Sequence, residues 1–76
     1  MIKAGVIIEV FNELDRSDHI HGKMPEMVEG LHTLKCEVAE LEREIMRKNH
    51  DPAAMKVEAV QVAAMGLKFL RDCCHE

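Results

Sequence analysis

The chain has 76 residues, of which 47% are hydrophobic and 32% are charged, and its net charge is -4 with histidine neutral. A chain this short forms one domain with a modest core, so we take residues 1–76 as a single helical domain. The acidic balance argues against a nucleic-acid partner, because phosphate backbones are bound by basic surfaces. No apolar run reaches the ~20 residues that span a bilayer, and no leader pattern is visible, so we expect a cytoplasmic protein without membrane contact.

The spacing of hydrophobic residues predicts an all-α fold. Apolar residues recur at steps of three and four, which is the period of a helix, and strong helix formers dominate the composition. We expect Gly22 to end the first helix, and Asp51 and Pro52 to cap and begin the third. The three expected helices are, in chain order, about 2–18, 25–48 and 52–73.

The second and third helices carry apolar faces of different widths. In the second helix we expect a buried apolar stripe, made of Leu31, Leu34, Val38, Leu41 and Ile45. The third helix is apolar over most of its circumference, and its narrow polar stripe consists of Glu58, Gln61, Lys68 and Asp72, with Met65 among them. Such a helix needs burial on more than one side, so we expect helices two and three to pack antiparallel inside a homodimer or a tetramer.

Sulfur-containing residues give weaker signals. The three cysteines are an odd number, which indicates no disulfide framework. The run Cys73, Cys74, His75 resembles a soft-metal site, but adjacent cysteines rarely serve one zinc ion, and a frayed helix end is the favoured interpretation. The methionines at helical spacing are interpreted as core residues, and His32 and His50 as surface residues.

Acidic and amide side chains recur at a spacing of three on the second and third helices. Glu37 and Glu40 share one helix face, and so do Glu58 and Gln61. If the two helices pack against each other, these four oxygen-bearing side chains converge on a site suited to Mg²⁺, which in turn binds phosphates. The competing interpretation is that Glu37 and Glu40 lie on a solvated face and that Glu58 and Gln61 form a polar stripe facing water.

The order of these segments resembles the MazG-like all-α nucleotide pyrophosphohydrolases, particularly their short phage and bacterial forms. The family pattern is EExxE on one helix and ExxD on the next. The first matches at Glu37 and Glu40 with Cys36 in place of the first glutamate, and the second matches at Glu58 with Gln61 in place of the aspartate. The segment 61–72, QVAAMGLKFLRD, is also similar to the closing helix of the family, with Lys68 where relatives carry arginine.

This resemblance implies Mg²⁺-dependent hydrolysis of a nucleoside triphosphate to a monophosphate and pyrophosphate. Glu37, Glu40, Glu58 and the carbonyl oxygen of Gln61 would then be metal ligands, with Glu37 and Glu40 as the catalytic carboxylates. Lys68 is either a solvated side chain or a phosphate contact, and His21 is either a turn residue or a nucleotide contact. A function of a different class, a non-catalytic oligomeric helical module for binding or regulation, is the alternative.

Overall fold

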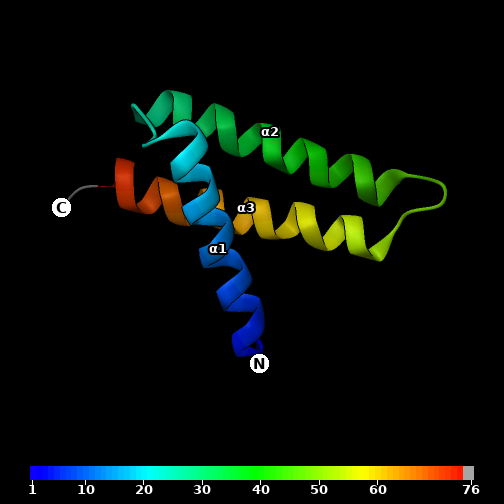
Figure 1. Ribbon diagram of the computed structural model, residues 1–76. Coiled ribbons are helices and arrows are strands. Elements are labelled where there is room, and N and C mark those ends of the chain that lie inside the picture. Colours follow the sequence, from blue (N-terminus) through cyan, green and yellow to red (C-terminus); the bar gives the residue numbers. More distant parts are fainter. Residues whose placement is uncertain (75–76) are drawn as a thin grey trace.

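The computed structural model describes residues 1–74, and this part consists of three α-helices without a strand (Figure 1). The helices are α1 (Ala4–His21), α2 (Met27–Met46) and α3 (Pro52–Cys73). The expected all-α, three-helix fold is therefore confirmed. α3 has the expected bounds, whereas α1 begins and ends later than expected and α2 is shorter at both ends. Among the described residues, no helix combines the length and the apolar character needed to cross a membrane.

Local capping interactions explain where the helices begin and end. Gly22 has a φ angle of 69°, a left-handed conformation that glycine adopts without strain, and its N–H donates to Asp18 O at 2.9 Å. Because Gly22 is the residue that leaves helical geometry, α1 continues through His21. At the start of α3, Asp51 accepts a hydrogen bond from the Ala53 N–H at 3.0 Å, and Pro52 is the first helical residue, as predicted.

α3 is the central helix of the chain, because it packs against both α1 and α2 whereas these two do not pack against each other. α2 lies alongside α3, and residues 47–51 connect them at one end (Figure 1). α1 crosses α3, so its N-terminal half projects away from the α2–α3 pair (Figure 1). α2 approaches α3 closely at Gly30, where a Cβ atom would lie 2.9 Å from Cδ2 of Phe69.

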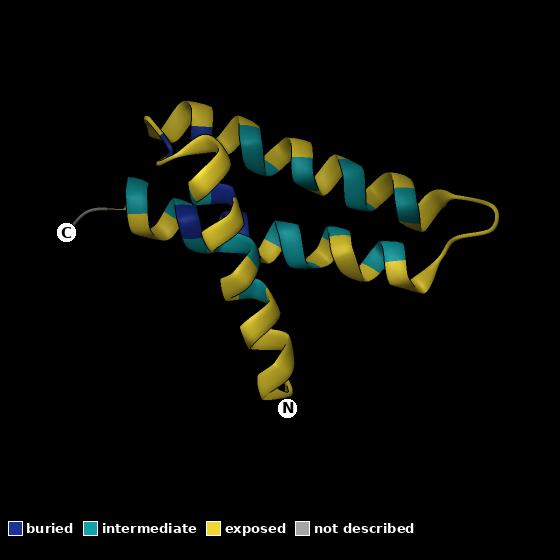
Figure 2. Ribbon diagram, viewed as in Figure 1, coloured by how far each residue is buried: buried dark blue, intermediate teal, exposed yellow. Residues whose placement is uncertain are grey.

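Few apolar side chains are buried (Figure 2). Met24, Ala64 and Met65 form the core, with residues such as Leu34 and Phe69 packed partly against them. The prediction of a fully buried stripe on α2 is wrong: Leu34 and Leu41 are half-buried, and the other three members, Leu31, Val38 and Ile45, are 51%, 51% and 46% exposed. The prediction that the methionines fill the core holds for Met24 and Met65 but is wrong for Met27 and Met46, which are 65% and 76% exposed.

The polar side chains of α2 and α3 occupy the faces at which the helices meet. On α3, Lys68 is buried, so the interpretation of Lys68 as a solvated side chain is wrong, and the Asp72 side chain is only 4% exposed. Apolar residues of the same helix face outward instead, with Val57 54% and Leu70 60% exposed. The partly buried side of α2 likewise mixes the acids Glu37, Glu40 and Glu44 with Leu34 and Leu41.

Candidate metal centre

Three glutamates meet where α2 and α3 face each other, and we call Glu37, Glu40 and Glu58 the acid cluster. Glu37 and Glu40 are separated by one turn of α2, and Glu58 comes from α3. One carboxylate oxygen from each lies within 4.8 Å of the others, and all three side chains are half-buried. The sequence-based expectation that these acids converge, rather than facing solvent on opposite sides, agrees with this geometry.

The acid cluster concentrates negative charge in a partly desolvated position. Burial raises the pKa of the Glu37 carboxyl above its usual value, and the neighbouring Glu40 raises it further by charge repulsion and hydrogen bonding. The pKa of Glu58 is raised for the same two reasons, burial first and Glu40 second. A group of carboxylates that resists full ionisation gains stability when a cation or a hydrogen-bond donor is placed among them.

Gln61 supplies such a donor, because its amide lies between two of the carboxylates. In the orientation that places the amide nitrogen toward the acids, it donates to Glu37 Oε2 at 3.1 Å and to Glu58 Oε2 at 3.0 Å. This orientation satisfies both carboxylates, whereas the opposite one would set the amide oxygen against them. Rotation of the same amide by a half turn would direct its carbonyl oxygen to a cation instead.

The donor set at this position fits a hard divalent cation. Three carboxylates and one amide offer only oxygen ligands, which Mg²⁺ and Ca²⁺ prefer and softer metals do not select. Cys36 does not add a sulfur ligand: its side chain is exposed and its Sγ lies 3.8 Å from Nε2 of His32, one turn back on α2. The acid cluster is therefore chemically uniform and strongly negative.

A cavity of about 270 Å³ adjoins the acid cluster, and we call it the Glu37 pocket. Glu37 and Gln61 contribute acidic and amide groups to its wall. The wall also carries four side chains that are cationic or can become so, namely Arg16, His21, Lys23 and Lys68. A pocket that combines carboxylates with basic groups can hold an anion beside a metal ion. The predicted substrate contacts His21 and Lys68 both line it.

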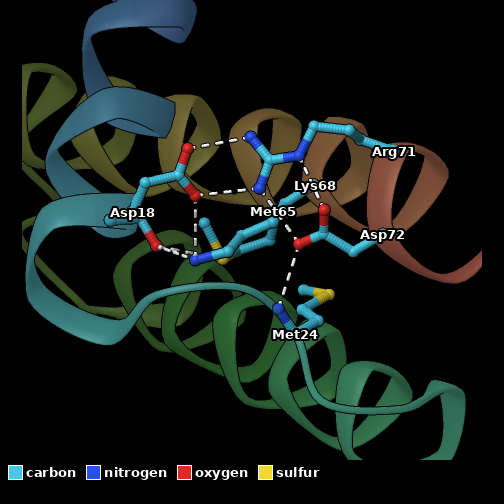
Figure 3. Close-up of polar contacts among 7 residues, drawn as sticks. Asp18, Met24, Met65, Lys68, Arg71 and Asp72 are labelled. Carbon is cyan, nitrogen blue, oxygen red and sulfur yellow. Dashed lines mark hydrogen bonds and ion pairs between the residues drawn. The ribbon is translucent and has the colours of Figure 1, made fainter.

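Lys68 belongs to a charged network that joins α1, the loop before α2, and α3 (Figure 3). Its ammonium donates to Ser17 Oγ at 3.0 Å and lies 3.4 Å from Asp18 Oδ1. Arg71 donates to both carboxylate oxygens of Asp18, at 2.8 and 2.9 Å, and also contacts Asp72. Asp72 accepts the backbone N–H of Met24 at 3.0 Å, which ties the loop before α2 to α3. We call these groups the Lys68 network.

The structure also identifies site residues that sequence reasoning missed. Glu13 and Arg16 on α1 form a bidentate pair, at 2.8 and 2.7 Å, and both line the Glu37 pocket. Ser17 is buried beneath the pocket and holds Lys68. The spacing of three between Glu13 and Arg16 was visible in the sequence, but nothing in the sequence showed that α1 crosses α3 at this point. In the run Cys73, Cys74, His75, for which a frayed helix end is favoured over a soft-metal site, the histidine lies outside the described residues, so neither interpretation is tested.

Comparisons with known proteins give no further guide. A scan against protein-family models and searches of curated proteins and of solved structures each found no match. What supports a function is therefore the acid cluster, the Glu37 pocket and the residues that carry the family resemblance.

Proposed function

We propose that the chain is a Mg²⁺-dependent nucleoside triphosphate pyrophosphohydrolase that releases a nucleoside monophosphate and pyrophosphate. The observation that carries the proposal is the convergence of Glu37, Glu40 and Glu58, whose ligand oxygens lie within 4.8 Å of one another. The proposal takes α2 and α3 as an antiparallel pair and the assembly as a homodimer or tetramer. It places the chain in the cytoplasm, with nucleoside triphosphates rather than nucleic acids as partners.

In this proposal the acid cluster and the carbonyl oxygen of Gln61 hold the cation. When bound, Mg²⁺ supplies positive charge that binds the phosphate oxygens and stabilises the charge that develops on them. With a cation bound, the amide of Gln61 would turn its oxygen to the cation and would no longer bridge Glu37 and Glu58. Because an amide is uncharged, four ligands here carry three negative charges, and we expect weaker Mg²⁺ binding than a site of four carboxylates would show.

The Glu37 pocket receives the triphosphate beside the acid cluster. Arg16, His21 and Lys23 lie on its wall and offer charge to phosphate oxygens. Lys68 has three N–H donors, of which Ser17 and Asp18 engage two, so one donor remains for a phosphate. Lys68 thereby acts as a support for α1 and a substrate contact at once.

Glu37 is the general base of the proposed reaction. Of the three clustered acids it is the one that lines the Glu37 pocket, where the triphosphate and the attacking water would lie. It removes a proton from water as the water oxygen bonds to the α-phosphorus, and the bond from that phosphorus to the bridging oxygen breaks, so that pyrophosphate leaves. Glu40, the second catalytic carboxylate, lies one turn away on α2 and would hold the cation together with Glu58.

A pyrophosphate-release assay tests the proposal. The chain is incubated with Mg²⁺ and each ribo- and deoxyribonucleoside triphosphate in turn. We expect release from at least one of them, and we expect Glu58→Gln to lower the rate more than about a hundredfold, since loss of a ligand removes several kcal/mol of stabilisation. Glu42→Gln is the matched control, because Glu42 is an exposed acid of α2 outside the cluster. If no nucleoside triphosphate yields pyrophosphate, the proposed enzymatic function is refuted.

A second candidate function is a non-catalytic oligomeric helical module for binding or regulation. The observation that favours it is the double hydrogen bond of Gln61, which holds Glu37 and Glu58 together without any cation. A module of this kind would show no hydrolysis, and its melting temperature would not respond to Mg²⁺. The same protein samples therefore distinguish the two functions.

A further inference from the structure

α1 and α3 enclose an apolar groove on the face of the chain away from the acid cluster, and we call it the α1–α3 groove. It has a volume of about 730 Å³. Its wall includes Ile7, Val10 and Phe11 of α1 and Ala59, Val60 and Ala63 of α3. Lys56 is the only charged residue on its wall, and its ammonium is engaged by Glu9 at 3.1 Å. A groove of this composition offers no site for a charged ligand.

The exposed surface area of the chain is larger than that of a compact monomer of the same mass, which indicates that part of the surface packs against a partner. The chain exposes 5858 Å², whereas a compact monomer of 8.6 kDa exposes about 4,700 Å². The excess is about 1,200 Å², and a stable interface of standard size removes about 800 Å² from each partner. The excess is therefore enough for one such interface.

The distribution of that area points to the projecting half of α1. Ile7 is 47% exposed and Phe11 is 53% exposed, although side chains of this size are normally buried. Figure 2 shows this half of α1 almost entirely exposed, because it crosses α3 and extends beyond it. Its opposite wall in the groove contains Ala59 and Ala63, whose small side chains leave room for a ridge of larger ones.

We propose that the occupant of the α1–α3 groove is the α1 ridge of a second copy of this chain, so that Ile7 and Phe11 of each copy enter the groove of the other. A two-fold dimer needs a surface that complements itself, and this face carries both a ridge of large side chains and a groove with a floor of small ones. The described part of the chain buries three apolar residues, and oligomerisation is one way in which a fold this small gains stability. A second copy is a partner present wherever the chain is made.

The inference deepens the self-association included in the proposed function by naming the contacting face. Its test measures oligomeric state and contacts, not hydrolysis, so the two proposals can fail separately. The outward stripe of α2 that includes Val38 and Ile45 is the competing face. That stripe is an exposed row on one helix, with no second helix beside it to form a groove.

Sedimentation equilibrium of wild type and variants gives the first test. We expect wild type to sediment with twice the mass of the chain, and Ile7→Glu and Phe11→Glu to weaken the dimer more than about thirtyfold, because each places two charges in an apolar contact. Ile45→Glu is the matched control, since Ile45 is 46% exposed and Ile7 47%. It should leave the dimer within about threefold of wild type. A monomeric wild type at about 100 µM, or loss of the dimer in Ile45→Glu with retention in Ile7→Glu, would overturn the inference.

Isotope-filtered NMR of wild type makes the test independent of whether the variants fold. A mixture of labelled and unlabelled chains reports contacts between copies only. Phe11 and Phe69 are the two aromatic residues of the chain, and Phe69 packs near Gly30, so the Phe11 ring signals can be assigned. We expect contacts between the Phe11 ring of one copy and the methyl groups of Ala59 and Ala63 of the other. A dimer without these contacts, or a monomer that instead binds phosphatidylcholine vesicles, would refute the proposed occupant.

Discussion

α3 contributes to two charged clusters that differ in charge balance, and the difference indicates where a bound cation would have the larger effect. Toward its C-terminal end, Lys68 and Arg71 face Asp18 and Asp72, so positive and negative charges balance and each is paired. Toward its N-terminal end, the acid cluster contains three carboxylates that lie together, and a neutral amide is their partner. The balanced network holds the helices in place. The unbalanced one carries electrostatic repulsion that a bound cation would relieve.

The pKa directions in the two clusters agree with this division of roles. Arg71, followed by Lys68, holds the pKa of Asp18 down, from 3.8 to about 2, because the charged carboxylate is stabilised there. Glu37 and Glu58 shift in the opposite direction, because burial and like charges disfavour their ionised forms. The four predictions below test the contrast, from the largest expected effect to the smallest.

Lys68→Ala should have the largest effect, on stability. It removes a buried side chain and leaves Ser17 Oγ without its donor, so we expect a loss of about 3 kcal/mol in the free energy of unfolding. Urea unfolding measures this loss. Lys35→Ala is the control, because Lys35 is exposed on α2, and it should change stability by less than about 0.5 kcal/mol. If Lys68→Ala unfolds like wild type, the Lys68 network does not support the fold and the contrast between the clusters fails.

Gln61→Glu should strengthen Mg²⁺ binding about tenfold, because it adds a fourth negative charge to the ligand set. Isothermal titration calorimetry at matched ionic strength measures the dissociation constant. Without metal, the same substitution replaces the donor that bridges Glu37 and Glu58 by another acceptor, so the melting temperature should fall. Gln61→Met is the control for loss of the amide without added charge, and it should weaken Mg²⁺ binding. Equal affinity in all three proteins would show that Gln61 is not a ligand.

The two clusters should respond to pH in opposite directions. The folded pKa values of Glu37 and Glu58 lie above 4.5, so their contribution to stability is present below that pH and is lost as pH rises through the folded values. For Asp18 the contribution is present above 3.8 and is lost as pH falls toward about 2. We expect the metal-free melting temperature to decline by a few degrees as pH rises above 4.5 and these carboxyls ionise.

The decline should be smaller in Glu37→Gln, which removes one of the raised carboxyls, and absent in saturating Mg²⁺. Differential scanning calorimetry at constant ionic strength provides the comparison. Asp15→Asn, an exposed acid of α1, is the matched control and should decline like wild type. An identical pH profile in Glu37→Gln would show that the acids are not strained in the metal-free protein.

Local signals in the sequence predicted the helices and the convergence of the acids, but not which face of each helix is buried. Spacing of three and four identified the helical segments. Gly22 marked the end of the first helix, and Asp51 with Pro52 marked the start of the third, because capping depends on nearby residues alone. The convergence of Glu37, Glu40 and Glu58 followed from two spacings of three on helices that contact each other.

The burial of the stripes could not be predicted in the same way. Apolar patterning indicates which side of a helix is suited to burial. It does not indicate whether that side packs against the same chain or against another one. Leu31, Val38 and Ile45 are exposed, whereas Leu34 and Leu41 of the same stripe are half-buried. The crossing of α1 over α3, which brings Arg16 and Ser17 to the Glu37 pocket, depends on long-range packing that no local pattern encodes.

Cys36→Glu should have the smallest effect, although it restores the family pattern EExxE in the sequence. The Cys36 side chain is exposed and contacts His32 on its own helix, away from the acid cluster. A glutamate there would lie in high-dielectric solvent, where its charge is screened, so we expect Mg²⁺ affinity to change less than about twofold. The tenfold effect expected for Gln61→Glu is the internal reference, measured by the same calorimetry. A gain in Cys36→Glu as large as that reference would mean that the cation site extends around α2 to the first position of the motif, and the acid cluster would then be only part of the site.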